Sequence, residues 1–292
     1  MSKPRLARAA TFGAAILLGA LTAGLDVALA TESASYPDLR GQWIGILRRV
    51  QGLPGQPSFD PSKPWGRGQD APLTPEYEAV LDANLKAQTQ GGLGNTTGAL
   101  CLGFGMPIIT YGFEPMEFVV TPEVTYVLID WVEHTRRIYT DGRDWPAEIE
   151  PAMSGYSIGR WIDEDHDGRY DILEVETRGF KGPRYYDAAG VPLHHDNESI
   201  FKERIYLDRD DKNILHNEIT VYDHALTRPW TVVRDLRRIP NPRPNWQEFN
   251  CAASNPYVAI GNETYFLSAD GLLMPMRKGQ PAPDLRYFKT LP

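Results

Sequence analysis

Short runs of β-branched and aromatic residues, separated by turn signals, fill this chain from about residue 118 to residue 237. Such runs are typical of strands that pack one face of a sheet against a core. The runs fall at residues 118–120, 124–140, 155–162, 171–178, 200–207, 213–222 and 229–237. About six to nine antiparallel strands at this spacing form either a sandwich or a barrel, so a mainly β fold is expected.

Two turns and one helix complete the expected framework. Asp141-Gly142 predicts a hairpin turn, and residues 208–212 predict a second, acidic turn. A helix is expected at about residues 75–88, because Thr74 suits the N-cap, Pro75 the first helical position and Glu76 the first turn. The apolar stripe of this helix consists of Tyr77, Val80, Leu81 and Leu85.

The N-terminus has the pattern of an export signal. Lys3, Arg5 and Arg8 precede an apolar segment at residues 11–25, and Ala28-Leu29-Ala30 provides a small-x-small cleavage site. The apolar segment is shorter than a membrane span, and no later stretch is long and apolar enough for one. We therefore expect residues 1–30 to be removed and residues 31–292 to form one domain in the periplasm or outside the cell.

Charge and cysteine content restrict the partners further. The net charge of −8 gives an acidic surface that repels phosphate backbones, so nucleic acid is not an expected partner. Cys101 and Cys251 are the two cysteines, and in an exported chain they most simply form one disulfide; a catalytic thiol is the rival interpretation. The Pro- and Asn-rich segment after Pro240 is expected to be an irregular wrap pinned by Cys251.

Motifs along the chain resemble those of known families. Gly41-x-Trp43 resembles the signature of lipocalin-like barrels, in which the Trp closes one end. From about Leu39 to Cys251 the chain resembles a large group of exported, mostly uncharacterised bacterial proteins. The motifs that carry this resemblance are residues 73–76, Cys101 with residues 105–107, and residues 137–143, 155–161, 177–180, 203–204 and 246–251. The resemblance implies an antiparallel, lipocalin-like β-barrel and implies no particular reaction.

The chain departs from this group at three places. An acidic insertion follows the Gly-Arg-Trp motif, where group members have a short turn. Trp145 replaces a common histidine after the Asp-Gly-Arg turn, and His224 replaces a common proline near a strand end. If either position lines a cavity, the chemistry of this protein would differ from that of the group.

Residues 163–174 have the spacing of a calcium-binding loop. Asp163, Asp165, Asp167, Asp171 and Glu174 supply carboxylates, the backbone carbonyl of Arg169 supplies a further oxygen, and Gly168 occupies the sharp turn. Because the flanking residues favour strands over helices, we expect a β-hairpin with Ca²⁺ at its tip. The role of Ca²⁺ would be structural. The alternative is an acidic, solvated turn without metal.

The segment 130–137 concentrates ionisable groups on an expected strand. Alternation places Asp130, His134 and Arg136 on one face, and Trp131, Glu133 and Arg137 on the other. One of these sets must point into the barrel. Buried charges of this kind serve either a ligand or proton transfer, or else a hydrogen-bonded structural network.

Histidines near strand ends form the second candidate set. His194-His195 could act as an acid/base or a metal pair at the barrel mouth, although neighbours on a strand cannot both face one ion. His224 lies beside Asp223 at a strand end, which is a plausible rim position. A solvated loop is the alternative interpretation of the histidine pair.

These features favour an enzyme that works inside the barrel without an organic cofactor. Acid/base pairs would come from Asp130, Glu133, His134, His195 and His224, and Arg136, Arg137 or Arg143 would stabilise negative charge. The expected chemistry is that of a lyase, isomerase or hydratase acting on an apolar or aromatic small molecule. The alternatives are a non-catalytic carrier of a hydrophobic ligand and an envelope protein with a filled barrel.

Overall fold

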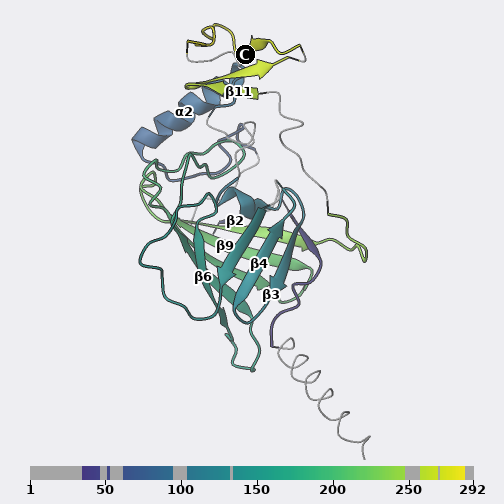
Figure 1. Ribbon diagram of the computed structural model, residues 1–292. Coiled ribbons are helices and arrows are strands. Elements are labelled where there is room, and N and C mark those ends of the chain that lie inside the picture. Colours follow the sequence, from purple (N-terminus) through teal and green to yellow (C-terminus); the bar gives the residue numbers. More distant parts are fainter. Residues whose placement is uncertain are drawn as a thin grey trace, which may run out of the picture.

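The computed structural model describes residues 35–46, 51–52, 62–94, 104–131, 134–246, 257–268 and 270–286. These residues form a closed, mostly antiparallel barrel with one α-helix and a small separate sheet (Figure 1). The mainly β, lipocalin-like barrel expected from the sequence is thereby confirmed. The expected signal peptide and the proposed Cys101–Cys251 disulfide lie outside the described residues.

Nine strands make the barrel, and they follow one another around it in chain order, with β1 beside β3. They are β1 (Gln42–Gly45), β3 (Met116–Val120), β4 (Val124–Ile129), β5 (His134–Tyr139), β6 (Tyr156–Ile162), β7 (Ile172–Arg178), β8 (Ile200–Leu207), β9 (Ile214–Tyr222) and β10 (Trp230–Arg238). Pairing of β1 with β10, with Trp43 opposite Arg238, closes the barrel. A short strand, β2 (Gln51–Gly52), adds to β10.

The expectation of one long strand over residues 124–140 is wrong. The segment forms two antiparallel strands, β4 and β5, with Ile129 paired opposite His134 across a tight turn. A continuous strand of that length would exceed the usual 3–10 residues, and a turn within it keeps both halves on the barrel wall. The turn takes Asp130 and Trp131 out of the strand.

The expected hairpin at Asp141-Gly142 is also wrong. The turn itself forms, because Gly142 has the positive φ of 77° that such a turn requires. The chain then crosses over and β6 pairs parallel to β5, with Ile138 opposite Ser157. Pro146 and Pro151 lie in the crossover, and proline cannot donate a ladder hydrogen bond that would continue a hairpin.

Helix α2 (Pro75–Thr89) agrees with its expected bounds to within one residue. The Thr74 side chain accepts a hydrogen bond from the Tyr77 amide, Pro75 starts the helix, and acidic residues occupy the first turn. Tyr77 and Leu81 are buried as expected, whereas Val80 is exposed. The Asn84 amide donates to the carbonyls of Ala189 and Gly190, which fixes the helix against the segment before β8.

The barrel interior is filled by its own side chains and by a plug. The plug contains the 3₁₀ helix η2 (Ile108–Tyr111), whose four residues are all buried. Arg234 of β10 donates to the Pro107 carbonyl at 2.7 Å, and its guanidinium lies over the Tyr111 ring. Gly45 permits the close approach of β1 to this plug, since a Cβ there would lie 2.0 Å from the Tyr111 carbonyl oxygen.

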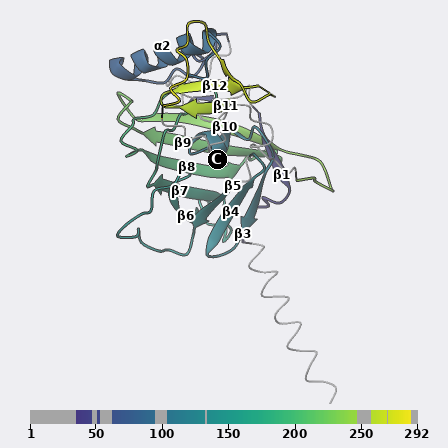
Figure 2. The ribbon, with the colours of Figure 1, turned by 45° about the horizontal axis from the view of Figure 1, so that its top comes forward.

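The chain beyond the barrel is more regular than the sequence suggested. Strands β11 (Tyr257–Ile260), β12 (Glu263–Leu267) and β13 (Leu273–Pro275) form an antiparallel sheet. This sheet and α2 lie together at one end of the barrel in both views (Figures 1 and 2). The expected irregular wrap is therefore only part of this region.

Among the described residues, no helix combines the length and apolar character needed to cross a membrane.

Candidate functional site

The charged set inside the barrel centres on Arg136 and Glu203. Both side chains are buried, and the Arg136 guanidinium donates to both carboxylate oxygens of Glu203. Arg136 also donates to Ser157 Oγ at 3.2 Å and to Thr177 Oγ1 at 2.8 Å. Asn217 donates to Glu203 at 2.9 Å, so the pair and its three hydrogen-bonding partners come from five consecutive strands, β5 to β9.

The space next to this pair is too small for a substrate. The cavity bounded by Ile129, Arg136, Ile205 and Asn217, among others, has a volume of about 20 Å³. That volume holds about one water molecule, whereas ligand pockets typically measure roughly 300–1,000 Å³. The expected apolar or aromatic cavity is therefore not present at this position, and Arg136 with Glu203 forms the structural network that was the alternative interpretation.

The other expected residues of this segment do not join Arg136. Arg137 is exposed on the opposite face of β5, as alternation requires, and Asp130 is buried beyond the end of β4. Arg143 is bound to Asp141 and lies over the Tyr139 ring on the outside of the barrel. Glu133 and the His134 side chain lie outside the described residues.

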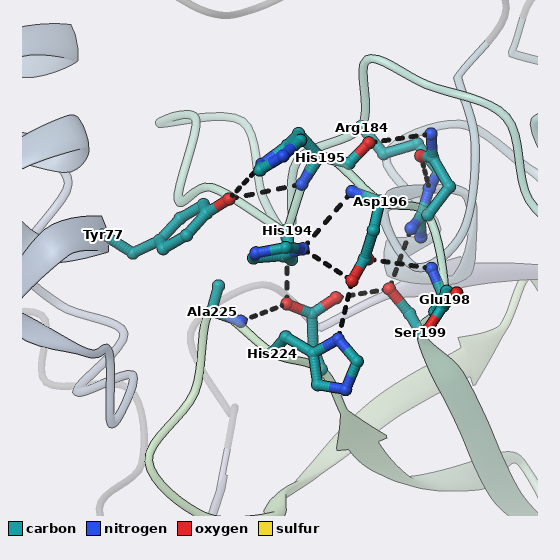
Figure 3. Close-up of polar contacts among 11 residues, drawn as sticks. Tyr77, Arg184, His194, His195, Asp196, Glu198, Ser199, His224 and Ala225 are labelled. Atoms are coloured by element: carbon teal, nitrogen blue, oxygen red, sulfur yellow. Dashed lines mark hydrogen bonds and ion pairs between the residues drawn. The ribbon is translucent and has the colours of Figure 1, made fainter.

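The expected histidines, in contrast, come together. His194, His195 and Asp196 lie in the loop before β8, and His224 lies in the loop between β9 and β10. Figure 3 shows His194 and His224 pointing toward the Asp196 carboxylate. The distances from Asp196 Oδ2 to the ring nitrogens are 2.6 Å for His224 Nδ1 and 2.8 Å for His194 Nδ1. We call His194, Asp196 and His224 the rim cluster.

Backbone contacts and a second carboxylate hold the rim cluster in place. Asp223 accepts hydrogen bonds from the amides of His194 at 2.9 Å and Ala225 at 2.8 Å, and from the Ser199 hydroxyl. The Glu198 amide donates to Asp196 at 3.0 Å. These bonds connect the loop before β8 with the loop between β9 and β10. They therefore fix the position of His194 and Asp196 relative to His224.

His195 has a different partner from His194. Its Nδ1 lies 2.9 Å from the Tyr77 hydroxyl, which also accepts a hydrogen bond from the His195 amide. The two adjacent imidazoles thus contact different groups. Helix α2 contributes Tyr77 to the site, and only the tertiary structure reveals this, because the sequence pattern assigns Tyr77 to the apolar stripe alone.

Electrostatics distinguish the groups of this site. Burial raises the pKa of Asp196, but hydrogen bonds from the Glu198 amide and the two imidazoles outweigh it and hold the pKa well below the usual range. The Asp196 carboxylate raises the pKa of His224. Burial lowers the pKa of Arg184 to about 10 and raises the pKa of Tyr77. Arg184 donates to Ser199 Oγ at 2.8 Å, so a guanidinium lies behind the Asp223 carboxylate.

The acidic loop forms the tip of the β6–β7 hairpin, as expected. One carboxylate oxygen from each of Asp163, Asp165 and Asp171 lies within 4.8 Å of the others. Asp167 instead accepts a hydrogen bond from the Arg169 amide, and Gly168 has the positive φ of 88° expected at the turn. Glu174 lies within β7, where it accepts hydrogen bonds from Arg160 at 2.7 and 3.0 Å. The structure thus brings together three of the five expected carboxylates.

A wide groove of about 1260 Å³ lies beside this hairpin, away from the rim cluster. Its lining carries both signs of charge, and Arg204 forms an ion pair with Glu164 at 2.8 Å across it. Because these charges neutralise one another, the groove offers no concentrated potential for a charged ligand. We place the candidate site at the rim cluster, where ionisable groups converge.

Comparison with protein families and with curated proteins finds no match for this chain. The resemblance to exported bacterial proteins therefore stays an interpretation of motifs. The candidate site rests on its geometry alone.

Proposed function

We propose that this protein is an enzyme whose active site is the loop region around His194, His195, Asp196 and His224, and that it acts by proton transfer on a small molecule. The observation that carries the proposal is the convergence of three histidines, two aspartates and a tyrosine from three separate segments. Scattered surface histidines of purely structural loops have no need of such shared positioning.

The Tyr77–His195 pair is the proton-transfer element of the proposal. A tyrosine hydroxyl 2.9 Å from an imidazole nitrogen can relay a proton to or from a substrate at this rim. His195 is exposed while Tyr77 is buried, so the imidazole meets the substrate and the tyrosine hydroxyl passes the proton to or from the imidazole. A lyase, isomerase or hydratase reaction on a small molecule fits this pair, and no organic cofactor is needed.

The location of the site alters the expected substrate. An apolar or aromatic molecule was expected in the barrel lumen, where the cavity of about 20 Å³ has no room for it. The rim is lined by imidazoles, carboxylates and a guanidinium, so a polar molecule suits it better. The alternative of a hydrophobic carrier needs a larger cavity than the one beside Arg136.

Untargeted mass spectrometry on a metabolite extract tests this proposal. The wild-type protein should consume some compound over many turnovers, and Tyr77→Phe should slow that reaction by about 10²–10⁴-fold. Tyr222→Phe, an exposed tyrosine on the barrel wall, is the matched control and should leave the rate unchanged. No consumption by wild-type protein, or equal rates for wild type and Tyr77→Phe, would overturn the proposal. An unchanged compound that copurifies one-to-one would establish a carrier instead.

We also propose that the β6–β7 hairpin binds one Ca²⁺ as a structural ion. Asp163, Asp165 and Asp171 supply converging oxygens, and the Arg169 carbonyl and Asp167 remain candidate ligands from the same loop. Glu174 would have to leave Arg160 to complete the expected set. The ion would restrain the hairpin without contacting substrate.

We also propose that the protein is exported and that residues 1–30 are its signal peptide. Mass spectrometry of the protein recovered from periplasm or medium should give a mature chain that begins near Thr31. Recovery of the full-length chain from the cytoplasm would contradict it.

A further inference from the structure

Three side chains with metal-binding atoms converge at the rim cluster. One ligand atom from each of His194, Asp196 and His224 lies within 4.8 Å of the other two. We infer that these three residues bind a single divalent transition-metal ion, with Zn²⁺ as the probe that fits their chemistry. Two imidazoles and one carboxylate are a common protein ligand set for catalytic zinc and for related ions.

The distances require only a small adjustment to admit an ion. In a tetrahedral zinc site, bonds of about 2.0–2.2 Å place neighbouring ligand atoms about 3.3–3.5 Å apart. The present distances to Asp196 Oδ2 are 2.6 and 2.8 Å, so the ligands need to separate by less than about 1 Å. His224 is a loop residue with an exposed side chain. Rotation of this side chain can provide the movement without shifting the barrel strands.

The geometry around His194 places two ligand atoms side by side. His194 Nδ1 lies 2.8 Å from Asp196 Oδ2, and the Asp196 amide lies 3.3 Å from the same nitrogen. An imidazole nitrogen has one lone pair, so a metal on Nδ1 would replace the contact with the amide. The carboxylate and the imidazole would then both face the ion.

The charges and exposure of the site favour a metal with an open coordination position. Asp223 and Glu198 lie beside Asp196 of the cluster, and Arg184 contacts Asp223 through Ser199. The His224 side chain is 65% exposed, which leaves one side of the cluster open to water or substrate. Three protein ligands and an open position characterise catalytic rather than structural zinc sites.

Hydrogen bonds from neighbouring residues hold the proposed ligands Asp196 and His194 in place. The second oxygen of Asp196 accepts the Glu198 amide, and the His194 backbone is anchored to Asp223. Such contacts orient ligands and are part of the affinity of a site.

This inference deepens the proposed function by naming a cofactor for the same site, and its catalytic meaning rests on that function. When bound, the ion would supply Lewis-acid chemistry at the rim. Tyr77 and His195 are not among the proposed metal ligands, so this pair stays available for proton transfer. Metal binding is measured without turnover, so either proposal can fail while the other stands.

The test is a competition titration of the mature, untagged protein with Zn²⁺ against a chromophoric chelator, in excess Ca²⁺ to saturate the acidic hairpin. Wild-type protein should bind one Zn²⁺. His224→Ala and Asp196→Asn should each lower its affinity by at least about 100-fold. His166→Asn, an exposed histidine in the acidic loop, is the matched control and should change the affinity by less than about twofold.

A second readout guards against loss of folding. The variants should keep the wild-type circular dichroism spectrum, and Co²⁺ should give a visible absorption band with wild type and His166→Asn that both ligand variants lack. Zn²⁺ affinity equal to wild type in His224→Ala and Asp196→Asn, or no Zn²⁺ bound by wild type, would overturn the inference. Zn²⁺ binding by a protein with no detectable turnover would leave the metal site standing and remove the proposed function.

Discussion

The barrel interior and the rim both contain carboxylates next to cationic groups, but the two regions use them differently. Inside, Arg136 and Glu203 are buried and bound to Ser157, Thr177 and Asn217, with space for about one water beside them. At the rim, His194 and His224 share one oxygen of Asp196, and His224 is open to solvent. Completed hydrogen bonding leaves the interior pair nothing to offer a ligand.

The comparison teaches that ionisable residues need access before they can carry chemistry. The sequence made the segment 130–137 the most attractive catalytic candidate because of its charge density. Burial decided otherwise, since a charge in a closed core must be fully paired to be tolerated. The following predictions test this division, from the largest expected effect to the smallest.

Breaking the interior pair should have the largest effect on stability. Glu203→Ala leaves the Arg136 charge buried without its carboxylate, and we expect the free energy of unfolding to fall by about 3–5 kcal/mol. Urea denaturation of the variant measures this loss. A change below about 1 kcal/mol would mean that water reaches Arg136 and that the interior is not closed.

A double substitution separates burial of charge from loss of packing. Arg136→Met with Glu203→Leu replaces both charges by apolar groups and should be clearly more stable than Glu203→Ala alone. If the double variant is as unstable as the single one, shape rather than charge dominates this part of the core.

Calcium removal should give the next largest effect. If Ca²⁺ binds the hairpin, a concentration of about 100 times its Kd stabilises the fold by about 2.7 kcal/mol, and a chelator should lower Tm accordingly. Asp165→Asn should lower Tm in Ca²⁺ and make it insensitive to the chelator. A wild-type Tm that does not respond to the chelator would mean that the acidic turn holds no ion.

His216 is an intermediate case, because it is half-buried between two carboxylates. Its ring nitrogens lie 2.8 Å from Asp235 and 2.9 Å from Asp208. Burial lowers its pKa, but these two hydrogen bonds outweigh burial and raise the pKa above the usual 6.5. The stabilisation is therefore complete below about pH 6.5 and is lost as the pH rises through the raised value.

Thermal denaturation between pH 6 and 9 measures this effect. The wild-type protein should lose stability relative to His216→Gln as the pH increases, because the variant has no imidazolium to lose. The same bond lowers the pKa of Asp208 to about 2, so a second loss is expected in acid between about pH 4 and 2. Parallel curves for the two proteins over pH 6–9 would contradict the assignment.

An exposed ion pair should have the smallest effect. Glu174→Ala removes the carboxylate bound by Arg160, whose side chain is 75% exposed, and we expect a change in the free energy of unfolding of at most about 1 kcal/mol. Urea denaturation measures it beside Glu203→Ala. A loss as large as that of the interior variant would show that exposure does not separate the two regions.

Local sequence patterns determined the strands of this protein. Apolar alternation placed the strands from β6 to β10 within one or two residues of their observed ends, and the Thr74 cap with Pro75 fixed the start of α2. The acidic loop was also recognisable, because its residues lie within one turn of the chain. Interactions between residues close in sequence depend on spacing that can be counted directly.

Only the tertiary structure decided which ionisable groups meet. Tyr77 and His195 are 118 residues apart, Arg136 and Glu203 are 67 apart, and His224 and Asp196 are 28 apart. Barrel closure brings these segments together, and the same closure fills the lumen and leaves the rim accessible. Alternation placed Arg136 on the inner face of β5, but the space beside it depends on the plug and on facing strands. Periodicity reports which side of its own strand a residue occupies; it carries no information on how much room remains there.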